Sequence, residues 1–156
     1  MSLDDLYQQV ILEHYRSPKN RAPTLAGEDV HVHHSNPLCG DELDLRVDVE
    51  DDRVAALVFD GDGCSISQAS ASVMTETVKG RALDDALDLT EQFRLMMHGD
   101  TPSREDDLGD GIVFQGVAKF PVRVKCALLG WMALKDALET YRNGEHDHSV
   151  TIDGEA

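Results

Sequence analysis

Three cysteines and one aspartate are the residues of this 156-residue chain best suited to chemistry. Cys39 is followed by Gly40 and Asp41, and the glycine allows a backbone bend that turns both side chains toward one point. Cys64 and Cys126 lie farther along the chain, each at the edge of a predicted element. Three thiolates and a carboxylate suit tetrahedral zinc, and thiolates also hold iron–sulfur clusters. If the fold brings Cys39, Asp41, Cys64 and Cys126 together, they form a metal site.

Cys64 occupies a position that favours the thiolate. An apolar and β-branched run over residues 54–59 stops at two glycines, and a helical pattern begins after them. The unpaired N–H groups and the positive end of a helix dipole stabilise a thiolate and lower its pKa. The alternative is a small buried hydrophobe after a tight turn, because free cysteine is often found in a core.

Arg123 and Lys125 precede Cys126 and offer charge support to a metal site. Zinc with three thiolates and one carboxylate carries net negative charge, which two cations offset while favouring thiolate over thiol. Cations at a helix start oppose the helix dipole, so their presence favours a functional role over a solvated face. The chain lacks the tight CxxC pairs of a purely structural zinc site. An oxygen ligand from Asp41 would also make the site more exchangeable than one of thiolates alone.

Composition excludes several classes of partner. The formal net charge of −16 repels nucleic acid and acidic membrane surfaces, so we expect neither as a partner. No apolar run approaches the ~18 residues of a membrane span. An odd number of cysteines and no secretory signal pattern favour a reducing compartment, and we expect a cytoplasmic protein.

Three alternating runs predict a sheet. Residues 28–35 place Val30 and Val32 on one face, residues 43–49 alternate apolar with charged side chains, and a short acidic turn leads into residues 53–60. We therefore predict an α/β (α+β) sandwich in which a three-stranded antiparallel meander packs against helices.

Helical patterns surround this sheet. They predict helices from Ser2 to before Pro18, from Cys64 to about Lys79, and from Pro121 to near Gly144. Thr90 is expected to be the N-cap of a further helix, after a short amphipathic or extended segment at residues 82–87.

The polar, turn-rich stretch at about residues 99–116 is expected to be a surface excursion within a single domain spanning residues 1–144. We expect the acidic tail at residues 145–156 to be mobile.

Three histidines share one predicted strand. His31 and His33 alternate onto one face with no carboxylate motif beside them, and His34 follows. We interpret all three as solvated strand residues rather than as a metal clip.

The motifs around the cysteines resemble the SufU-type branch of the IscU/NifU-like iron–sulfur assembly proteins. The resemblance rests on the segments Asn36–Asp41, Gly61–Ser72 and Phe120–Cys126, and it spans about Leu6 to Arg142. Lys125 stands where IscU-type members have a histidine, and the polar stretch at 99–116 resembles the insertion of SufU-type proteins.

The resemblance implies an IscU/SufU-like sandwich that binds zinc through Cys39, Asp41, Cys64 and Cys126. It implies that Cys39 accepts persulfide sulfur from a SufS-type cysteine desulfurase, with downstream Suf cluster assembly proteins as later partners. The main alternative is a scaffold on which Cys39, Cys64 and Cys126 carry iron or a transient 2Fe–2S or 4Fe–4S cluster. A structural zinc domain and a thiol hydrolase are weaker alternatives.

Overall fold

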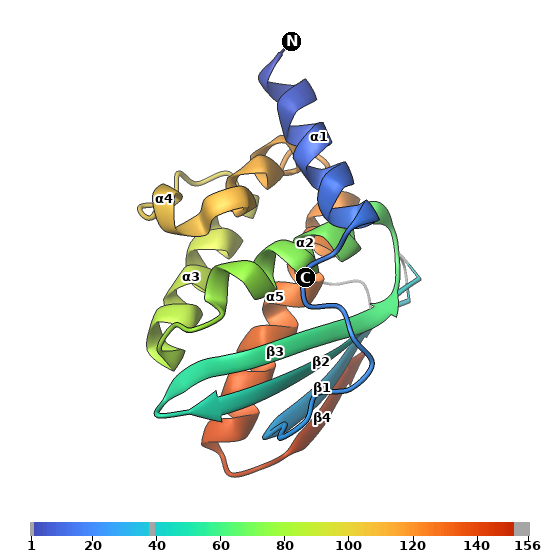
Figure 1. The fold of residues 1–156 in the computed structure, drawn as a ribbon. Helices are drawn as coiled ribbons and strands as arrows, with labels where there is room; N and C mark the ends of the chain where they lie inside the picture. The colour runs from blue at the N-terminus through green and yellow to red at the C-terminus, as the bar shows by residue number, and fades with distance from the viewer. Residues whose placement is uncertain (1, 38–39, 152–156) are drawn as a thin grey trace.

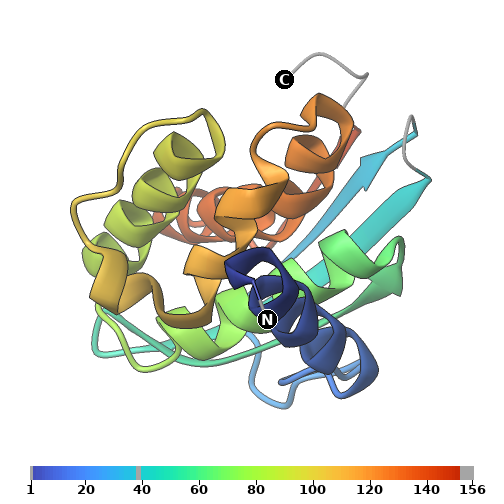
Figure 2. The ribbon, with the colours of Figure 1, turned by 90° about the horizontal axis from the view of Figure 1, so that it is seen from above.

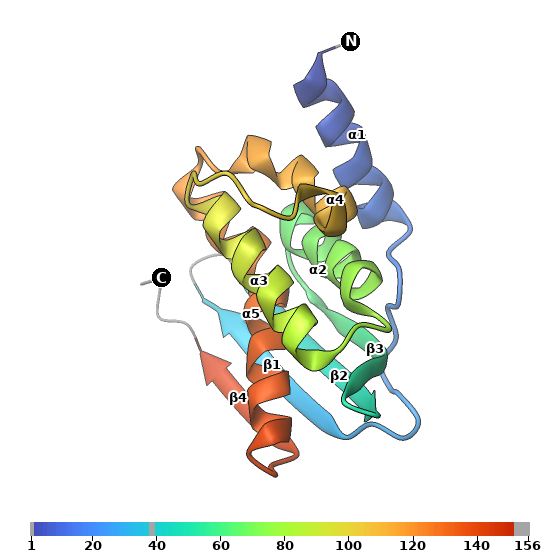
Figure 3. The same ribbon diagram turned by 90° about the vertical axis from the view of Figure 1, so that its left-hand side faces the viewer.

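The computed structural model of the chain describes residues 2–37 and 40–151. A four-stranded sheet forms one layer, and the helices form a second layer against one of its faces (Figures 1 and 3). In chain order the elements are α1 (Leu3–Arg16), β1 (Val30–Asn36), β2 (Asp41–Glu50), β3 (Arg53–Asp62), α2 (Ser65–Val78), α3 (Leu83–Met97), α4 (Glu105–Leu108), the 3-10 helix η1 (Gly109–Val117), α5 (Pro121–Arg142) and β4 (Asp147–Thr151).

The first three strands form the antiparallel meander predicted from their alternation. β1 pairs antiparallel with β2, and β2 with β3, in the sheet order β3-β2-β1-β4. Val30, Val32, Leu43 and Leu45 point into the core, because successive side chains of a strand alternate between its two faces. α5 covers β1 and β2, and α2 covers β3.

The fourth strand corrects the prediction of a three-stranded sheet, because residues 147–151 of the expected mobile tail form β4. Residues 152–156 of that tail lie outside the described residues. β4 pairs parallel with β1, with Val32 opposite His148, and the His31 N–H donates to the carbonyl of His146 over 2.8 Å. Without β4, the outer edge of β1 would present unpaired backbone N–H and C=O groups. The tail is rich in acids and histidines, and this composition does not indicate a strand. The predicted domain boundary at residue 144 therefore lies before β4.

The helix starts follow local sequence signals. Ser2 and Asp5 form a capping box at the start of α1, and Pro121 stands in the first turn of α5, where its missing N–H costs nothing. The prediction of an N-cap at Thr90 was wrong. Thr90 lies inside α3, where its hydroxyl donates to the carbonyl of Ala86 over 2.9 Å, the local bond that lets threonine sit within a helix.

α2 and α5 pack closely through small side chains. A Cβ atom added at Gly130 would lie 3.1 Å from the Cα of Ala71, so no larger residue fits there without movement. The next residue of α5, Trp131, stacks against Phe93 of α3, with 4.6 Å between ring centroids. α1 lies against α2 and η1 (Figure 2). None of the helices described at residues 2–37 and 40–151 has the length and apolar character of a membrane span.

The polar insertion is only partly a surface excursion. α4 and η1 lie within it, and Leu108, Val113 and Phe114 of this segment are buried. The Phe114 ring contacts Phe93 edge to face at 5.9 Å. The few apolar residues of the insertion therefore join the core, while its acids stay in solvent.

Candidate metal centre

One ligand atom from each of Asp41, Cys64 and Cys126 lies within 4.8 Å of the other two. Asp41 is the first residue of β2, Cys64 is the N-cap of α2, and Cys126 lies in the second turn of α5. The start of one strand and the starts of two helices thus meet at one end of the sandwich. Cys39, the fourth residue expected here, lies outside the described residues.

The buried carboxylate of Asp41 is fixed by the start of α2. Its side chain is 1% exposed, and Oδ1 accepts a hydrogen bond from the Cys64 backbone N–H over 2.9 Å. The second oxygen, Oδ2, lies 3.9 Å from Cys64 Sγ. A buried charge needs such partners, and a helix start supplies a free N–H group and a favourable dipole. One oxygen of Asp41 therefore positions the side chain while the other faces the thiols.

Gly63 is a site residue that the sequence reasoning did not assign. A Cβ atom at this position would lie 2.6 Å from Asp41 Oδ1 and 2.5 Å from Ser67 Oγ, so any side chain displaces one of them. Ser67 donates a hydrogen bond to the Cys64 carbonyl over 3.1 Å. The signal in the sequence was the second glycine of Gly61-Asp62-Gly63, whose role is close packing rather than an unusual backbone angle.

The local environment favours the thiolate of Cys64. A hydrogen bond with Cys126 and bonds from Ser67 lower the pKa of the Cys64 thiol to about 6, although burial and the charge of Asp41 act in the opposite direction. Cys64 is exposed and Cys126 is 5% exposed. The pair thus combines an exposed cysteine with a buried one.

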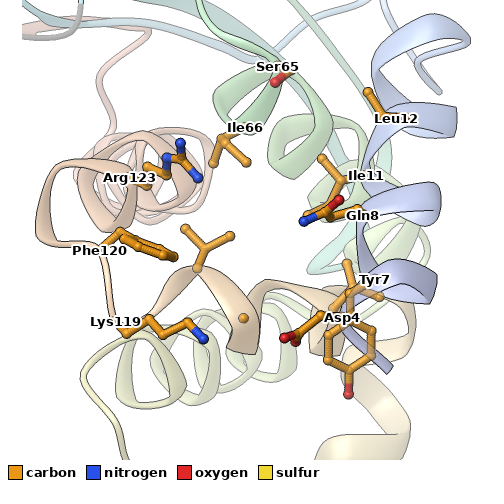
Figure 4. Close-up of a pocket in the computed structure, with 13 residues that line it drawn as sticks. Asp4, Tyr7, Gln8, Ile11, Leu12, Ser65, Ile66, Lys119, Phe120 and Arg123 are labelled. Atoms are coloured by element: carbon orange, nitrogen blue, oxygen red, sulfur yellow. The ribbon is translucent and has the colours of Figure 1, made fainter. Parts of the chain in front are cut away.

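Arg123 and Lys125 lie in the first turns of α5, ahead of Cys126. The Arg123 guanidinium lies over the Phe120 ring, 5.1 Å from its centroid. Arg123, Phe120 and Ser65 line a cavity of about 420 Å³ between α1, the start of α2, η1 and the start of α5 (Figure 4). Ser65 directly follows Cys64, so one wall of this cavity comes from the helix start that also carries Cys64.

The strand histidines divide between the two faces of the sheet. His31 and His33 are partly exposed, and both contact Asp44 Oδ1, at 2.7 and 3.2 Å. His34 does not fit the prediction of a solvated residue, because it is 4% exposed and its Nε2 lies 2.8 Å from Asp136 Oδ2. Its position in the alternation, on the face of Val30 and Val32, explains its burial.

Comparison with known proteins identifies a family and several relatives that this chain resembles. The model of the NifU-like N-terminal domain family matches residues 6–127. The zinc-dependent sulfurtransferase SufU of Bacillus subtilis is 42% identical over 143 residues, which cover 92% of this chain and 96% of that protein. The iron–sulfur cluster assembly scaffold protein IscU of Streptococcus pyogenes is 38% identical, with 92% of this chain and 89% of that protein covered.

Solved structures agree with the observed fold. An iron–sulfur cluster assembly scaffold protein for the SUF system from Fervidobacterium islandicum superposes with a TM-score of 0.78 at 34% identity, covering 83% of this chain and 94% of that one. A nitrogen-fixing NifU-like protein (N-terminal) from Brucella abortus gives a TM-score of 0.82 at 25% identity, covering 91% of this chain and 99% of that one. The α+β sandwich is thus shared over nearly the full length of these domains.

Proposed function

Because the chain belongs to the NifU-like N-terminal domain family, together with SufU- and IscU-type relatives, we propose that it serves iron–sulfur cluster assembly as a zinc-dependent sulfur acceptor. The proposed zinc ligands are Cys39, Asp41, Cys64 and Cys126. The proposed sulfur donor is a SufS-type cysteine desulfurase in the cytoplasm, and downstream Suf assembly proteins are the proposed recipients.

The observation that carries this proposal is the convergence of Asp41, Cys64 and Cys126 within 4.8 Å. Ligands of a single zinc ion with bonds of ~2.0 to 2.3 Å must lie this close to one another. The donor set also fits chemically, because the lowered pKa of Cys64 supplies a thiolate and Asp41 is held with one oxygen toward the sulfurs. Cys39 precedes Asp41 by two residues in the sequence, and this short separation supports it as the proposed fourth ligand.

Zinc, when bound, would keep the thiols deprotonated, and the carboxylate ligand would make exchange of one ligand easier. The Cys39 thiolate attacks the outer sulfur of the desulfurase persulfide. A new S–S bond forms on Cys39 as the old one breaks, and the desulfurase cysteine leaves as a thiolate. The transfer exchanges one persulfide for another, so it needs no external oxidant or reductant.

The other site residues hold the acceptor in place. Asp41 and Cys64 are tied to each other by the 2.9 Å hydrogen bond, so both stay fixed while Cys39, which precedes Gly40 in the sequence, exchanges. Gly40 has φ of 70°, a conformation that glycine adopts without strain. Arg123 and Lys125 supply positive charge in the turns of α5 that carry Cys126, and Arg123 with the exposed Phe120 offers the partner a surface at this end of the helix.

The proposal is tested with purified chain, a SufS-type desulfurase and labelled cysteine. We expect one zinc per chain, stimulation of desulfurase turnover, and label recovered as persulfide on Cys39. Cys39→Ser should keep the fold by circular dichroism yet lose the label, whereas His98→Gln, on an exposed helix end, should keep both. Undiminished labelling of Cys39→Ser would overturn the assignment of Cys39, and a chain without bound zinc or stimulation would overturn the proposed function.

A scaffold role is the second candidate, favoured by the IscU relatives whose names state that role. It predicts that anaerobic reconstitution with ferrous iron and sulfide produces a cluster that transfers intact to an apo target protein. A chain that retains zinc under these conditions and still accepts sulfur supports the acceptor role instead.

A further inference from the structure

A second group of metal-ligating side chains lies away from the thiols. His14 of α1, Glu76 of α2 and Asp110 of η1 bring one ligand atom each within 4.8 Å of the others. His14 Nε2 lies 2.9 Å from Asp110 Oδ2 and 3.7 Å from Glu76 Oε1. With bonds of ~2.0 to 2.2 Å to nitrogen or oxygen, neighbouring ligand atoms of one ion lie about 3 Å apart. The three atoms therefore have the spacing of a shared coordination sphere.

The imidazole of His14 is buried and oriented by its other nitrogen. Only 6% of the residue is exposed, and Nδ1 lies 2.8 Å from the hydroxyl of Ser72. That hydroxyl also accepts the backbone N–H of Lys19 over 2.7 Å. Metal-binding histidines are commonly held in this way, with one ring nitrogen fixed by a hydrogen bond so that the other faces the ion. Ser72 thus sets the direction in which Nε2 points.

The two carboxylates of this group have few cationic partners. Within the described residues, His14 is the only basic side chain that forms an ion pair with Glu76 or Asp110. Arg81, which lines a neighbouring hollow with both acids, is engaged by Asp85 at 2.8 Å. A cavity of about 520 Å³ opens onto the group, and Glu13, Arg16 and Lys19 also line it. An ion therefore has a route from solvent to Nε2 and to both carboxylates.

We propose that His14, Glu76 and Asp110 form a second metal site, which binds a divalent first-row transition ion through one imidazole nitrogen and two carboxylate oxygens. This ligand set lacks sulfur and is harder than the thiol centre, so it suits ions such as Mn²⁺ or Fe²⁺ that compete poorly for thiolates. The site joins α1, α2 and the inserted η1. It stands independently of the sulfur-acceptor proposal, because it shares no ligand with that centre.

The test uses the full chain loaded with one equivalent of zinc, which the thiol centre takes up first, and then titrated with Mn²⁺, whose free form is counted by electron paramagnetic resonance. We expect one Mn²⁺ per chain at saturation, with paramagnetic broadening of the His14 ring signals in the NMR spectrum. Asp110→Asn and Glu76→Gln each remove one ligand charge from an exposed side chain and should weaken binding by about tenfold or more. Glu139→Gln removes the same charge from an exposed position on α5 and should leave the affinity unchanged.

Several outcomes would overturn the site. Equal Mn²⁺ affinity in the two ligand variants and in Glu139→Gln would mean that the ion only screens an acidic surface. Broadening of the His31 and His33 signals, with the His14 signals unaffected, would show that the ion binds on the other face of the sheet. Absence of any stoichiometric Mn²⁺ binding to the zinc-loaded chain would end the proposal, whatever the outcome of the sulfur-transfer assay.

Discussion

The carboxylate of Asp41 accepts the backbone N–H of Cys64 over 2.9 Å, so one candidate ligand positions another. Asp41→Asn keeps an oxygen for this bond but loses the charge, whereas Asp41→Ala loses both. We expect Asp41→Ala to lower the free energy of unfolding of the zinc-free chain by about 1–3 kcal/mol, because the Cys64 N–H at the start of α2 loses its hydrogen bond to a charged group. Asp41→Asn should cost less stability, yet both should bind zinc more weakly. Urea unfolding and a chelator competition measure the two effects, and equal stability of the two variants would contradict the positioning role.

Gly63→Ala tests the close approach between the backbone and the Asp41 carboxylate. The added methyl group would lie 2.6 Å from Oδ1, which forces Asp41 to move. We expect a loss of about 1–3 kcal/mol in unfolding free energy, together with weaker zinc binding. Gly111→Ala is the matched control, because its Cβ would meet Leu108 and Phe93 at 3.7 Å, an ordinary contact, and it should change stability by less than about 1 kcal/mol. A Gly63→Ala chain with unchanged zinc affinity would contradict this account.

Replacement of the buried Gln68 is expected to stabilise the fold. The residue is 3% exposed, and among residues 2–37 and 40–151 neither its amide nitrogen nor its amide oxygen has a hydrogen-bond partner. Gln68→Met has a similar volume and removes the unpaired polar atoms, so it should raise the unfolding free energy by about 1–3 kcal/mol. Ser70→Ala is the contrasting change, since Ser70 donates to the Ala127 carbonyl over 2.6 Å and its loss should destabilise the chain. Destabilisation by Gln68→Met would show that the amide makes an interaction that the structure does not contain.

Stability should fall as the pH drops below neutral, because of His34 and Asp136. Burial lowers the pKa of His34 below its ordinary value of 6.5, and the charges of His148 and His33 act in the same direction, while Asp136 opposes them. The unfolded chain therefore binds a proton at His34 more readily than the folded chain does, and stability is lost as the pH falls through 6.5. Burial alone would raise the pKa of Asp136, but hydrogen bonds with His34 and His148 hold it below its ordinary value of 3.8, so this carboxylate adds a further loss in strong acid.

His34→Gln checks this pH dependence. Urea unfolding at several pH values between 7 and 5 should give a steeper loss of stability for the original chain than for His34→Gln, which carries no titrating ring. His98→Gln also removes a histidine but leaves His34 and Asp136 in place, so the loss of stability at low pH should persist. Identical slopes for the original chain and His34→Gln would assign the effect to other groups.

Local patterns in the sequence were sufficient for most of the fold. The grouping of Asp41, Cys64 and Cys126 was a condition that these patterns left open, and its prediction came from the resemblance to the SufU-type branch. Alternation predicted β1 to β3, and the glycines before Cys64 marked the turn from strand to helix. The same alternation assigns His34 to the face of Val30 and Val32, but its polarity suggested solvent. The buried partner, Asp136, is 102 positions away, and such a distant pairing is invisible to local reasoning.

The other features that the sequence did not reveal also depend on contacts between residues that are distant in the chain. β4 forms because β1 has an open edge, and the small acidic tail has no alternation strong enough to reveal a strand. Gly63 is required because Asp41 approaches it through space. The group of His14, Glu76 and Asp110 likewise assembles from three elements far apart in the chain. In each case the decisive contact joins residues that no periodic pattern connects.

The close packing of Gly130 against Ala71 has a consequence for the thiols. Cys126 precedes Gly130 by about one helical turn, and Cys64 precedes Ala71 by about two turns of α2. Since a Cβ at residue 130 would meet Ala71 at 3.1 to 3.2 Å, the separation of the two helix axes is set by the absence of side-chain volume at this crossing. The distance between the sulfurs then depends on steric size at two residues that carry no charge and touch no metal. Uncharged core residues that are not ligands thereby influence how far apart the ligand atoms of the metal site lie.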